Sequence, residues 1–197
     1  MNILFLDVET TGTDENKHSI LEIAAEFHKD GEKISQFSTK FADTNSVLSL
    51  EALKVNKTSL SEIKERKSEK EGVHSFCDWL INLDTSGGKT YICAHNAHFD
   101  KKFIDALFRK YNIENFEKVV SYRIIDTNDR ARMLVNAGAI DLESIGAKGT
   151  SLTNIAKALG IVIDETKLHT AEYDTEICSK VYYKQMELLE GLVNGKS

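Results

Sequence analysis

The sequence contains no proline among its 197 residues, whereas average usage of about 5% predicts roughly ten. This absence excludes proline-rich linkers and leaves Gly, Asn, Asp and Ser to form the turns. Cysteine is also scarce: Cys77, Cys93 and Cys178 lie in apolar stretches and lack the spacing of paired metal ligands. We therefore expect three reduced core thiols in a cytoplasmic protein.

Positive charge is in deficit, since the net charge is -6 and the sequence pI is about 5.6. An acidic balance argues against a broad basic surface for nucleic acid. It is compatible with an enzyme that binds one end of a nucleic-acid strand through metal ions, because the ions supply the positive charge. No long apolar run marks a signal peptide or a membrane span, and because an apolar strand is predicted from residue 2 or 3, we do not expect a targeting sequence. The 41% hydrophobic content suits a single domain over residues 1–197.

Periodicity along the chain predicts alternating strands and helices. The apolar run from Ile3 to Val8 is typical of a short buried strand. Asp30-Gly31 is a strong turn signal within a hairpin from Ser19 to Phe41. The apolar anchors of this hairpin are Ile20, Ile23, Phe27, Ile34 and Phe37. Further strands are predicted at residues 90–94 and 119–125. A short helix is predicted at residues 48–56, and the capping-box spacing of Ser59 and Glu62 predicts the start of a second one. Further helices are predicted at residues 73–83, 99–111, 126–135, 152–159 and 170–192.

These elements define the expected fold class. Three successive antiparallel strands followed by alternating helices and strands imply a mixed five-stranded α/β sheet flanked by helices. The charged run at residues 64–71 is typical of a solvated face or loop.

Asp7 and Glu9 are the most informative pair in the chain. Residues i and i+2 of a strand face the same side, so both carboxylates lie together at the end of the first strand. Burying two carboxylates is costly unless a cation lies between them. Oxygen ligands favour Mg²⁺ or Mn²⁺. The Thr-Thr-Gly sequence that follows breaks the strand where a ligand's backbone could approach closely.

Asp100 follows the strand predicted at residues 90–94. Asn96 is placed to cap the next helix, which would put Asp100 in its first turn. The helix dipole favours the ionised carboxylate there, a state that suits a metal ligand. The same pattern is also that of an ordinary helix start.

His169 and Asp174 are five residues apart, a spacing that turns a helix by about 500°. If both serve one site, His169 must precede the helix and Asp174 must lie in its first turns. Thr170 is a plausible cap for that arrangement. A histidine ahead of a helix is suited to act as a base near neutral pH.

Three segments in this order resemble the motifs of the DnaQ-like, or DEDDh, 3′–5′ exonucleases of the RNase H-like superfamily. The first is Leu6 to Gly12, the second is Ala94 to Asp100, and the third is His169 to Asp174. Residues 125–127 and 151–156 resemble the family's connecting segments, and residues 53–56 resemble its loop to the terminal nucleotide. The likeness covers about residues 3 to 182, and the three motifs together are far more specific than any one.

The resemblance implies roles for these residues. Two Mg²⁺ or Mn²⁺ ions would be held by Asp7, Glu9, Asp100 and Asp174, and His169 would take the proton from the attacking water. The products would be nucleoside 5′-monophosphates released from the 3′ end. The terminal nucleotide would be held by Thr10, Thr11, Gly12, Asn56, Asn96 and Phe99. His95 is expected to orient its neighbours through hydrogen bonds, and His98 has no assigned role. Phe99 is equally explained as a core residue of its helix.

Two departures from the family pattern concern substrate contacts. Leu50 stands where many relatives have proline, and Asn56 where several have histidine. A histidine rather than a tyrosine at position 169 assigns the chain to the DEDDh branch.

Other functions stay open. An inactive scaffold would keep the fold and bind nucleic acid or protein, but the complete set of carboxylates argues against it. An exoribonuclease of the oligoribonuclease or RNase T kind would differ only in its contacts with the 2′-OH; the form of the first motif favours single-stranded or frayed 3′ ends of DNA.

Partners are less defined by the sequence. The chain stops soon after its last predicted helix, so we do not expect a tail-tethered polymerase subunit. The segment from Gln185 to Leu189 resembles a sliding-clamp peptide, although helical periodicity explains Met186 and Leu189 equally well. Homodimerisation is left open, and no membrane association is expected.

Overall fold

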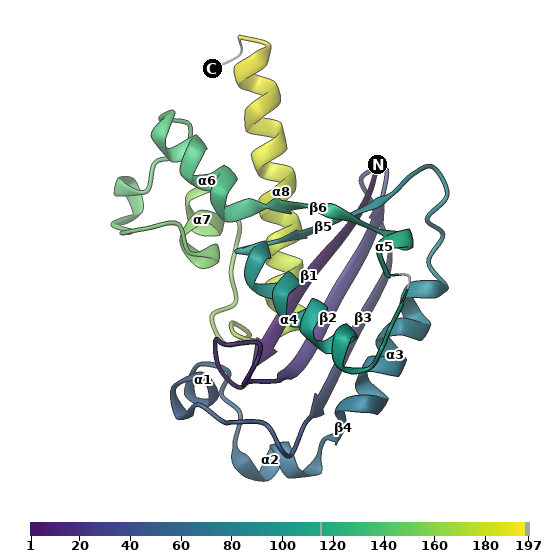
Figure 1. Ribbon diagram of the computed structural model, residues 1–197. Helices are drawn as coiled ribbons and strands as arrows, with labels where there is room; N and C mark the ends of the chain where they lie inside the picture. The colour runs from purple at the N-terminus through teal and green to yellow at the C-terminus, as the bar shows by residue number, and fades with distance from the viewer. Residues whose placement is uncertain (115, 196–197) are drawn as a thin grey trace.

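The computed structural model describes residues 1–114 and 116–195 as a six-stranded mixed sheet flanked by helices (Figure 1). The single-domain prediction also includes residues 115, 196 and 197, which lie outside the described residues. The order across the sheet is β4-β3-β2-β1-β5-β6. The strands are β1 (Asn2–Thr10), β2 (Ile20–Lys29), β3 (Glu32–Ala42), β4 (Lys67–Ser68), β5 (Thr90–Ala94) and β6 (Val120–Asp126).

The predicted strand directions are confirmed. β1, β2 and β3 are antiparallel neighbours, whereas β5 and β6 extend the sheet parallel to β1. Asp30 and Gly31 have φ of 52° and 92°, as a tight hairpin turn requires. The α/β fold class predicted from the sequence is therefore correct.

The predicted sheet was one strand short. Lys67 and Ser68, within the charged run expected to be solvated, pair in parallel with Phe41 and Ala42 as β4. Glu69, the next residue of that run, is only 4% exposed. Lys110 and Tyr111 both donate hydrogen bonds to its carboxylate, which explains how a charged group is accommodated there.

The helices cover both faces of the sheet, and α4 and α8 lie on opposite sides of the strands (Figure 1). Leu4, Leu6 and Val8 of β1 pack in the cluster that contains Phe76 and Phe103 of α3 and α4. The helices are α1 (Leu50–Val55), α2 (Leu60–Glu65), α3 (Glu69–Ile81), α4 (Ala97–Lys110), α5 (Phe116–Val119), α6 (Thr127–Asn136), α7 (Leu152–Ala158) and α8 (Ala171–Val193), with a 3₁₀ turn at Glu143–Ile145.

Alternation along β1 sends its other side chains toward α8. Ile3 and Phe5 pack with Cys178 and Tyr182 of that helix. Asp7 and Glu9 continue this series at the C-terminal end of the strand. The same alternation leaves Ile34 55% exposed, because Ser35 and Phe37 face α3 instead. The prediction that Ile34 anchors the hairpin was therefore wrong.

Helix starts follow the sequence in part. Ser59 and Glu62 form the predicted capping box of α2.

None of the described helices combines the length and the apolarity needed to cross a bilayer. Cys93 and Cys178 are buried, Cys77 is partly buried, and all three are free thiols.

Candidate active site

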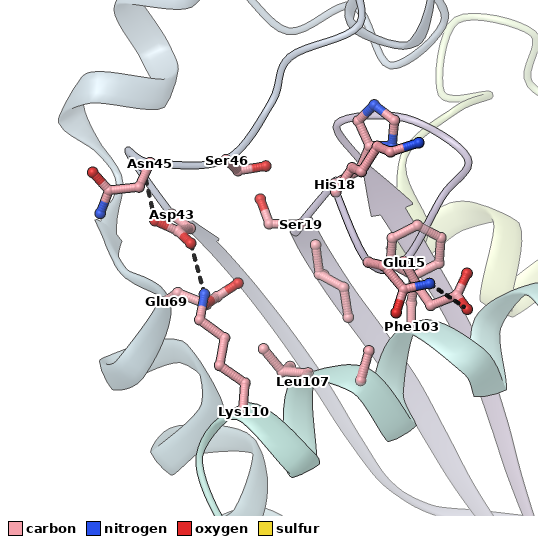
Figure 2. Close-up of a pocket in the computed structure, with 14 residues that line it drawn as sticks. Glu15, His18, Ser19, Asp43, Asn45, Ser46, Glu69, Phe103, Leu107 and Lys110 are labelled. Carbon is pink, nitrogen blue, oxygen red and sulfur yellow. Dashed lines mark hydrogen bonds and ion pairs between the residues drawn. The ribbon is translucent and has the colours of Figure 1, made fainter.

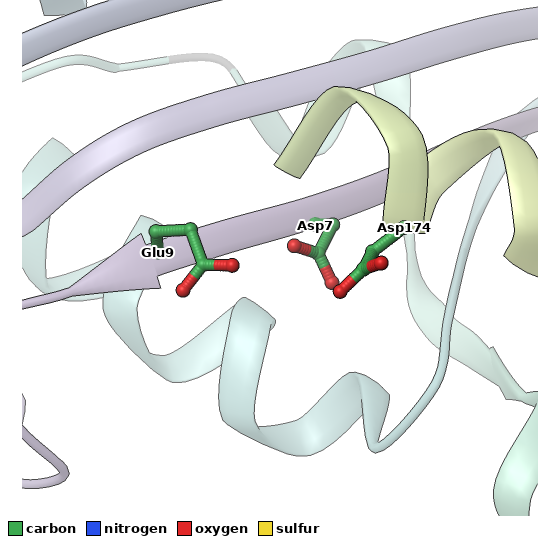
Figure 3. A group of neighbouring side chains, drawn as sticks. All are labelled: Asp7, Glu9 and Asp174. Atoms are coloured by element: carbon green, nitrogen blue, oxygen red, sulfur yellow. The ribbon is translucent and has the colours of Figure 1, made fainter. Parts of the chain in front are cut away.

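Three carboxylates meet where the end of β1 faces the start of α8 (Figure 3). One oxygen each from Asp7, Glu9 and Asp174 lie within 4.8 Å of one another. Asp7 and Glu9 share a face of β1, and Asp174 lies in the first turn of α8. The structure thus brings together residues separated by more than 160 positions in the chain.

Asp100 lies beside this group. It occupies the first turn of α4, as predicted, and is 3% exposed. Its Oδ1 accepts a hydrogen bond from the backbone N–H of Val8 at 3.0 Å. Because Val8 lies between Asp7 and Glu9, this bond fixes α4 against the acidic end of β1.

The four carboxyl groups oppose one another's ionisation. Burial raises the pKa of Asp7 well above its usual value, and the negative charges of Asp100, Glu9 and Asp174 raise it further. Burial, followed by the charges of Asp174 and Glu22, raises the pKa of Glu9 to about 7. Burial also raises the pKa of Asp100, although the Val8 N–H opposes the rise. Burial raises the pKa of Asp174 too, against the opposing influence of His169. A cation among these groups would relieve both effects.

The donor set fits divalent metal ions. Asp174 Oδ1 is buried and has no hydrogen-bond partner among the described residues. A buried carboxylate oxygen without a donor is costly, and a metal ion would satisfy it. Carboxylate oxygens are the ligands that Mg²⁺ and Mn²⁺ prefer.

His169 precedes α8, as the spacing to Asp174 required. It is exposed and has a left-handed backbone with φ of 66°. Thr170 stands at the N-cap, but its hydroxyl donates to the Lys167 carbonyl at 2.9 Å and makes no cap bond. The prediction of a Thr170 side-chain cap was therefore wrong, because the preceding turn uses that hydroxyl.

The loop after β1 is built largely from internal contacts. Thr10 Oγ1 donates to the Gly12 carbonyl at 2.6 Å. Thr11 is fully buried, and its hydroxyl contacts Ser46 Oγ and accepts from the Ser19 N–H, both at 3.0 Å. The Thr11 side chain thus shapes the loop and is not exposed to a ligand.

Gly12 is required by a close side chain. A Cβ at this position would lie 2.4 Å from the His18 ring. The sequence predicted close approach of a ligand's backbone here. The group that a Cβ would meet is the His18 imidazole, and the approach of a ligand's backbone to Gly12 stays a prediction.

Two further candidates for nucleotide contact, Asn56 and Asn96, bond within the protein. Asn56 Nδ2 donates to the Thr10 carbonyl at 2.9 Å. Asn96 has a left-handed backbone with φ of 75° and makes no side-chain cap bond; Asn128 Nδ2 donates to its Oδ1. Asn96 thus stands at the N-cap as predicted, but a capping bond from its side chain is absent, because the Asp126 carboxylate accepts the N–H groups at the start of α4.

Asp126 was not singled out by the sequence. Its carboxylate accepts the N–H groups of Asn96 at 3.2 Å and Ala97 at 2.8 Å, and it also caps α6. One side chain therefore fixes the start of α4, which carries Asp100. Only its place at the end of a predicted strand hinted at this role.

Phe99 is half-buried and packs on Phe103, with ring centroids 5.0 Å apart. With Asn96 and Lys102 it lines an open cavity of about 370 Å³ at the start of α4. The packing on Phe103 fits the interpretation of Phe99 as a core residue, and its contact with a substrate stays a prediction. His98, which had no assigned role, is exposed and lines the same cavity.

His95 is hydrogen-bonded on both ring nitrogens. Nδ1 contacts Thr127 Oγ1 at 2.9 Å, and Nε2 contacts the Thr150 carbonyl at 2.8 Å. Burial lowers its pKa, which favours the neutral ring. The expectation of a hydrogen-bonded residue at this position is confirmed.

Glu22 is a nearby acid that the sequence reasoning missed. It pairs with Glu9 across β1 and β2 and is buried, with Lys40 Nζ 3.5 Å from its carboxylate. Burial raises its pKa. A glutamate within a strand of buried apolar residues was the available signal.

A separate cavity of about 290 Å³ lies on the side of the sheet that α4 covers (Figure 2). Lys110 reaches across it to Asp43 at 2.6 Å and also pairs with Glu69. Lys110 thus pairs with two carboxylates of the lining, and none of the four clustered carboxylates lines this cavity.

Comparison with known proteins decides the family. The family model RNase_T, described as Exonuclease, matches residues 4–182. The chain belongs to this exonuclease family. The resemblance to DnaQ-like exonucleases of the RNase H-like superfamily is thereby confirmed.

The curated relatives that this chain matches are named as DNA polymerases. "DNA polymerase III PolC-type" of Staphylococcus saprophyticus is 32% identical over 94% of this chain and 11% of its own length. The protein of the same name from Mycoplasma pneumoniae is 26% identical over 97% of this chain and 12% of its own. The chain therefore spans about a tenth of the length of these relatives.

Solved structures share the fold of this exonuclease. Exonuclease I from Methylocaldum szegediense gives a TM-score of 0.76 at 17% identity, covering 94% of this chain and 40% of that one. E. coli Exonuclease I in complex with a dA16 oligonucleotide gives 0.74 at 18% identity, covering 98% and 43%.

The clamp-like segment of this exonuclease lies inside α8. Gln185 is fully buried and donates from Nε2 to the Thr127 carbonyl at 2.8 Å. Met186 packs against the Phe5 cluster. The segment is thus part of the core, and the sliding-clamp interpretation of these residues was wrong.

Proposed function

We propose that this exonuclease removes nucleoside 5′-monophosphates from the 3′ ends of DNA by a DEDDh-type mechanism. The observation that carries the proposal is the meeting of Asp7, Glu9 and Asp174 around an unpartnered carboxylate oxygen, with Asp100 beside them. The four carboxylates would hold two Mg²⁺ or Mn²⁺ ions. When bound, such ions supply positive charge that stabilises the attacking and leaving oxygens.

The protein's own groups would then carry the proton and orient the strand. His169 would accept a proton as water forms a bond to the terminal phosphorus and the bond to the penultimate 3′ oxygen breaks. That leaving oxygen takes up a proton in turn. The exposed position of His169 next to α8 supports access to such a water.

The terminal nucleotide would lie between the loop after β1 and the start of α4. The cavity lined by Asn96, Phe99 and Lys102 supports the α4 side of this placement, since Phe99 offers an aromatic face for stacking, although Asp126 and Asp129 also line it. Thr10, Gly12 and Asn56 would shape its opposite wall through their backbone contacts.

DNA is the proposed substrate for two reasons. The curated relatives are named as DNA polymerases, and a structural neighbour is described with a DNA oligonucleotide. A cytoplasmic location is proposed with it, where the three free thiols would stay reduced. Polymerase association and homodimerisation stay hypotheses.

The test is a time course on 5′-labelled single-stranded DNA, duplex DNA and RNA, with Mg²⁺, Mn²⁺ or EDTA. We expect stepwise shortening of DNA that EDTA abolishes and either cation restores. Faster loss of RNA would replace the proposal with an exoribonuclease. Cleavage of circular single-stranded DNA would contradict exonuclease action. No cleavage of any substrate would favour an inactive scaffold.

A further inference from the structure

Two adjacent side chains at the end of α1 reach both borders of the carboxylate site. Asn56 donates to the carbonyl of Thr10, the residue after Glu9, at 2.9 Å. Lys57 Nζ donates to the carbonyl of Leu168, the residue before His169, at 3.2 Å. The Lys57 contact joins segments 111 residues apart.

Lys57 and His169, the residue after Leu168, both have unusual backbones. Lys57 has φ of 51° and His169 has φ of 66°, in the left-handed region that residues other than glycine seldom adopt. Such conformations cost free energy and persist where the surrounding structure holds them. Lys57 is held by its N–H bond to the Lys54 carbonyl at 3.3 Å and by the neighbouring Thr58 N–H bond to Leu53 at 3.0 Å.

Most contacts of the loop that carries His169 lie in its first half, where Asp164 accepts hydrogen bonds from Thr166 and from the Lys167 N–H, and Lys157 pairs with Glu165 at 2.6 Å. Asp164 N–H donates to Tyr173 Oη at 2.7 Å near its beginning, and Thr170 bonds back to Lys167 near its end. The Lys57 ammonium supplies a contact from outside the loop, at the residue next to His169. It is also close enough for its charge to lower the pKa of Asp174.

We propose that Lys57 is a positioning residue that holds the His169 loop over the carboxylate site through the Leu168 carbonyl. The kinetic part of this inference rests on the proposed function, because it assigns His169 the role of base. A base must lie within hydrogen-bond reach of the attacking water, and a displacement of about 1 Å can cost 10²-fold in rate.

The structural test is amide hydrogen exchange of the full chain. Lys57→Met removes the ammonium group and keeps a long side chain at the same backbone position. We expect faster exchange in the peptide that covers residues 165–170 than in the wild type. Lys54→Met is the matched control, because it removes the same charge from an exposed residue of α1, three positions before Lys57. Unchanged exchange in Lys57→Met, or equal changes in both variants, would overturn the proposal.

The kinetic test compares kcat and KM on single-stranded DNA. We expect Lys57→Met to lower kcat by about 10-fold to 10²-fold with little change in KM, and Lys57→Arg to restore most of the rate. A raised KM with unchanged kcat would make Lys57 a direct substrate contact and would overturn the positioning role.

A double variant decides whether Lys57 acts through His169. In a His169→Asn background, Lys57→Met should lower kcat by less than about 2-fold, because the positioned group is already gone. A full additional loss would show that Lys57 acts independently of His169. If the wild type degrades no nucleic acid, the proposed function fails, while the exchange experiment still tests the tether.

Discussion

Asp100 accepts a hydrogen bond from the backbone N–H of Val8 at 3.0 Å, although the two residues are 92 positions apart. Val8 itself points into the apolar core, and its neighbours Asp7 and Glu9 point toward α8. The bond therefore places a carboxylate from α4 beside the acidic end of β1. It also explains how Asp100 joins the site without interrupting the core packing of Val8.

The first prediction concerns Glu9 and the pH dependence of stability. Its pKa is raised from 4.5 to about 7, first by burial. Because the pKa of Glu9 is higher in the folded than in the unfolded state, its neutral carboxyl group stabilises the fold fully below pH 4.5. This contribution is lost as the pH rises through 7. The shift corresponds to about 3 kcal/mol of unfolding free energy.

Urea unfolding in EDTA at pH 5 and pH 8 measures this loss. Glu9→Gln should lose less stability over that interval than the wild type, and saturating Mg²⁺ should reduce the wild-type loss. Identical pH profiles for the two metal-free proteins would contradict the buried, repelled state of Glu9.

The second prediction separates stability from activity at Asp7. Asp7→Asn removes a buried charge that is repelled by three neighbouring carboxylates. The metal-free variant should be more stable than the wild type at pH 8, measured as unfolding free energy in urea, while nuclease activity falls to background. Asp78→Asn, at an exposed position of α3, is the control for charge alone. Wild-type turnover by Asp7→Asn at saturating Mg²⁺ would remove Asp7 from the mechanism.

The third prediction concerns His169. Asparagine tolerates the left-handed backbone of this position but provides no base. His169→Asn should therefore keep the thermal stabilisation by Mg²⁺ and lose about 10²–10⁴-fold in kcat. In this variant the acidic limb of the pH–rate profile, measured at saturating metal, should also disappear. If the variant keeps the wild-type rate and limb, another group is the base.

The fourth prediction concerns Gly12 and His18. A Cβ at residue 12 would meet the His18 ring at 2.4 Å, so Gly12→Ala should destabilise the fold by about 1 to 3 kcal/mol. His18→Ala removes the obstructing ring and should recover most of that loss in the double variant. Thermal unfolding of the wild type, the two single variants and the double variant gives the coupling free energy between residues 12 and 18. Additive losses would mean that the ring is not the reason for glycine here.

Local sequence determined a large part of this protein. The bounds of β5 agree with the prediction from its apolar run, and the Asp30-Gly31 turn was predicted from its residue types. The shared face of Asp7 and Glu9 follows from the two-residue period of a strand. The position of His169 ahead of α8 followed from the spacing to Asp174. Each of these features depends on residues that are close together in the sequence.

The tertiary structure alone decided the contacts between distant segments. Asp126, not Asn96, holds the start of α4, and Thr11 is buried although its sequence motif marks it for substrate. Glu22 faces Glu9 only because β2 pairs with β1 in that register. Lys57 meets Leu168 across 111 residues. Periodicity and capping rules describe neighbours along the chain, whereas these contacts depend on how packed elements place distant side chains in space.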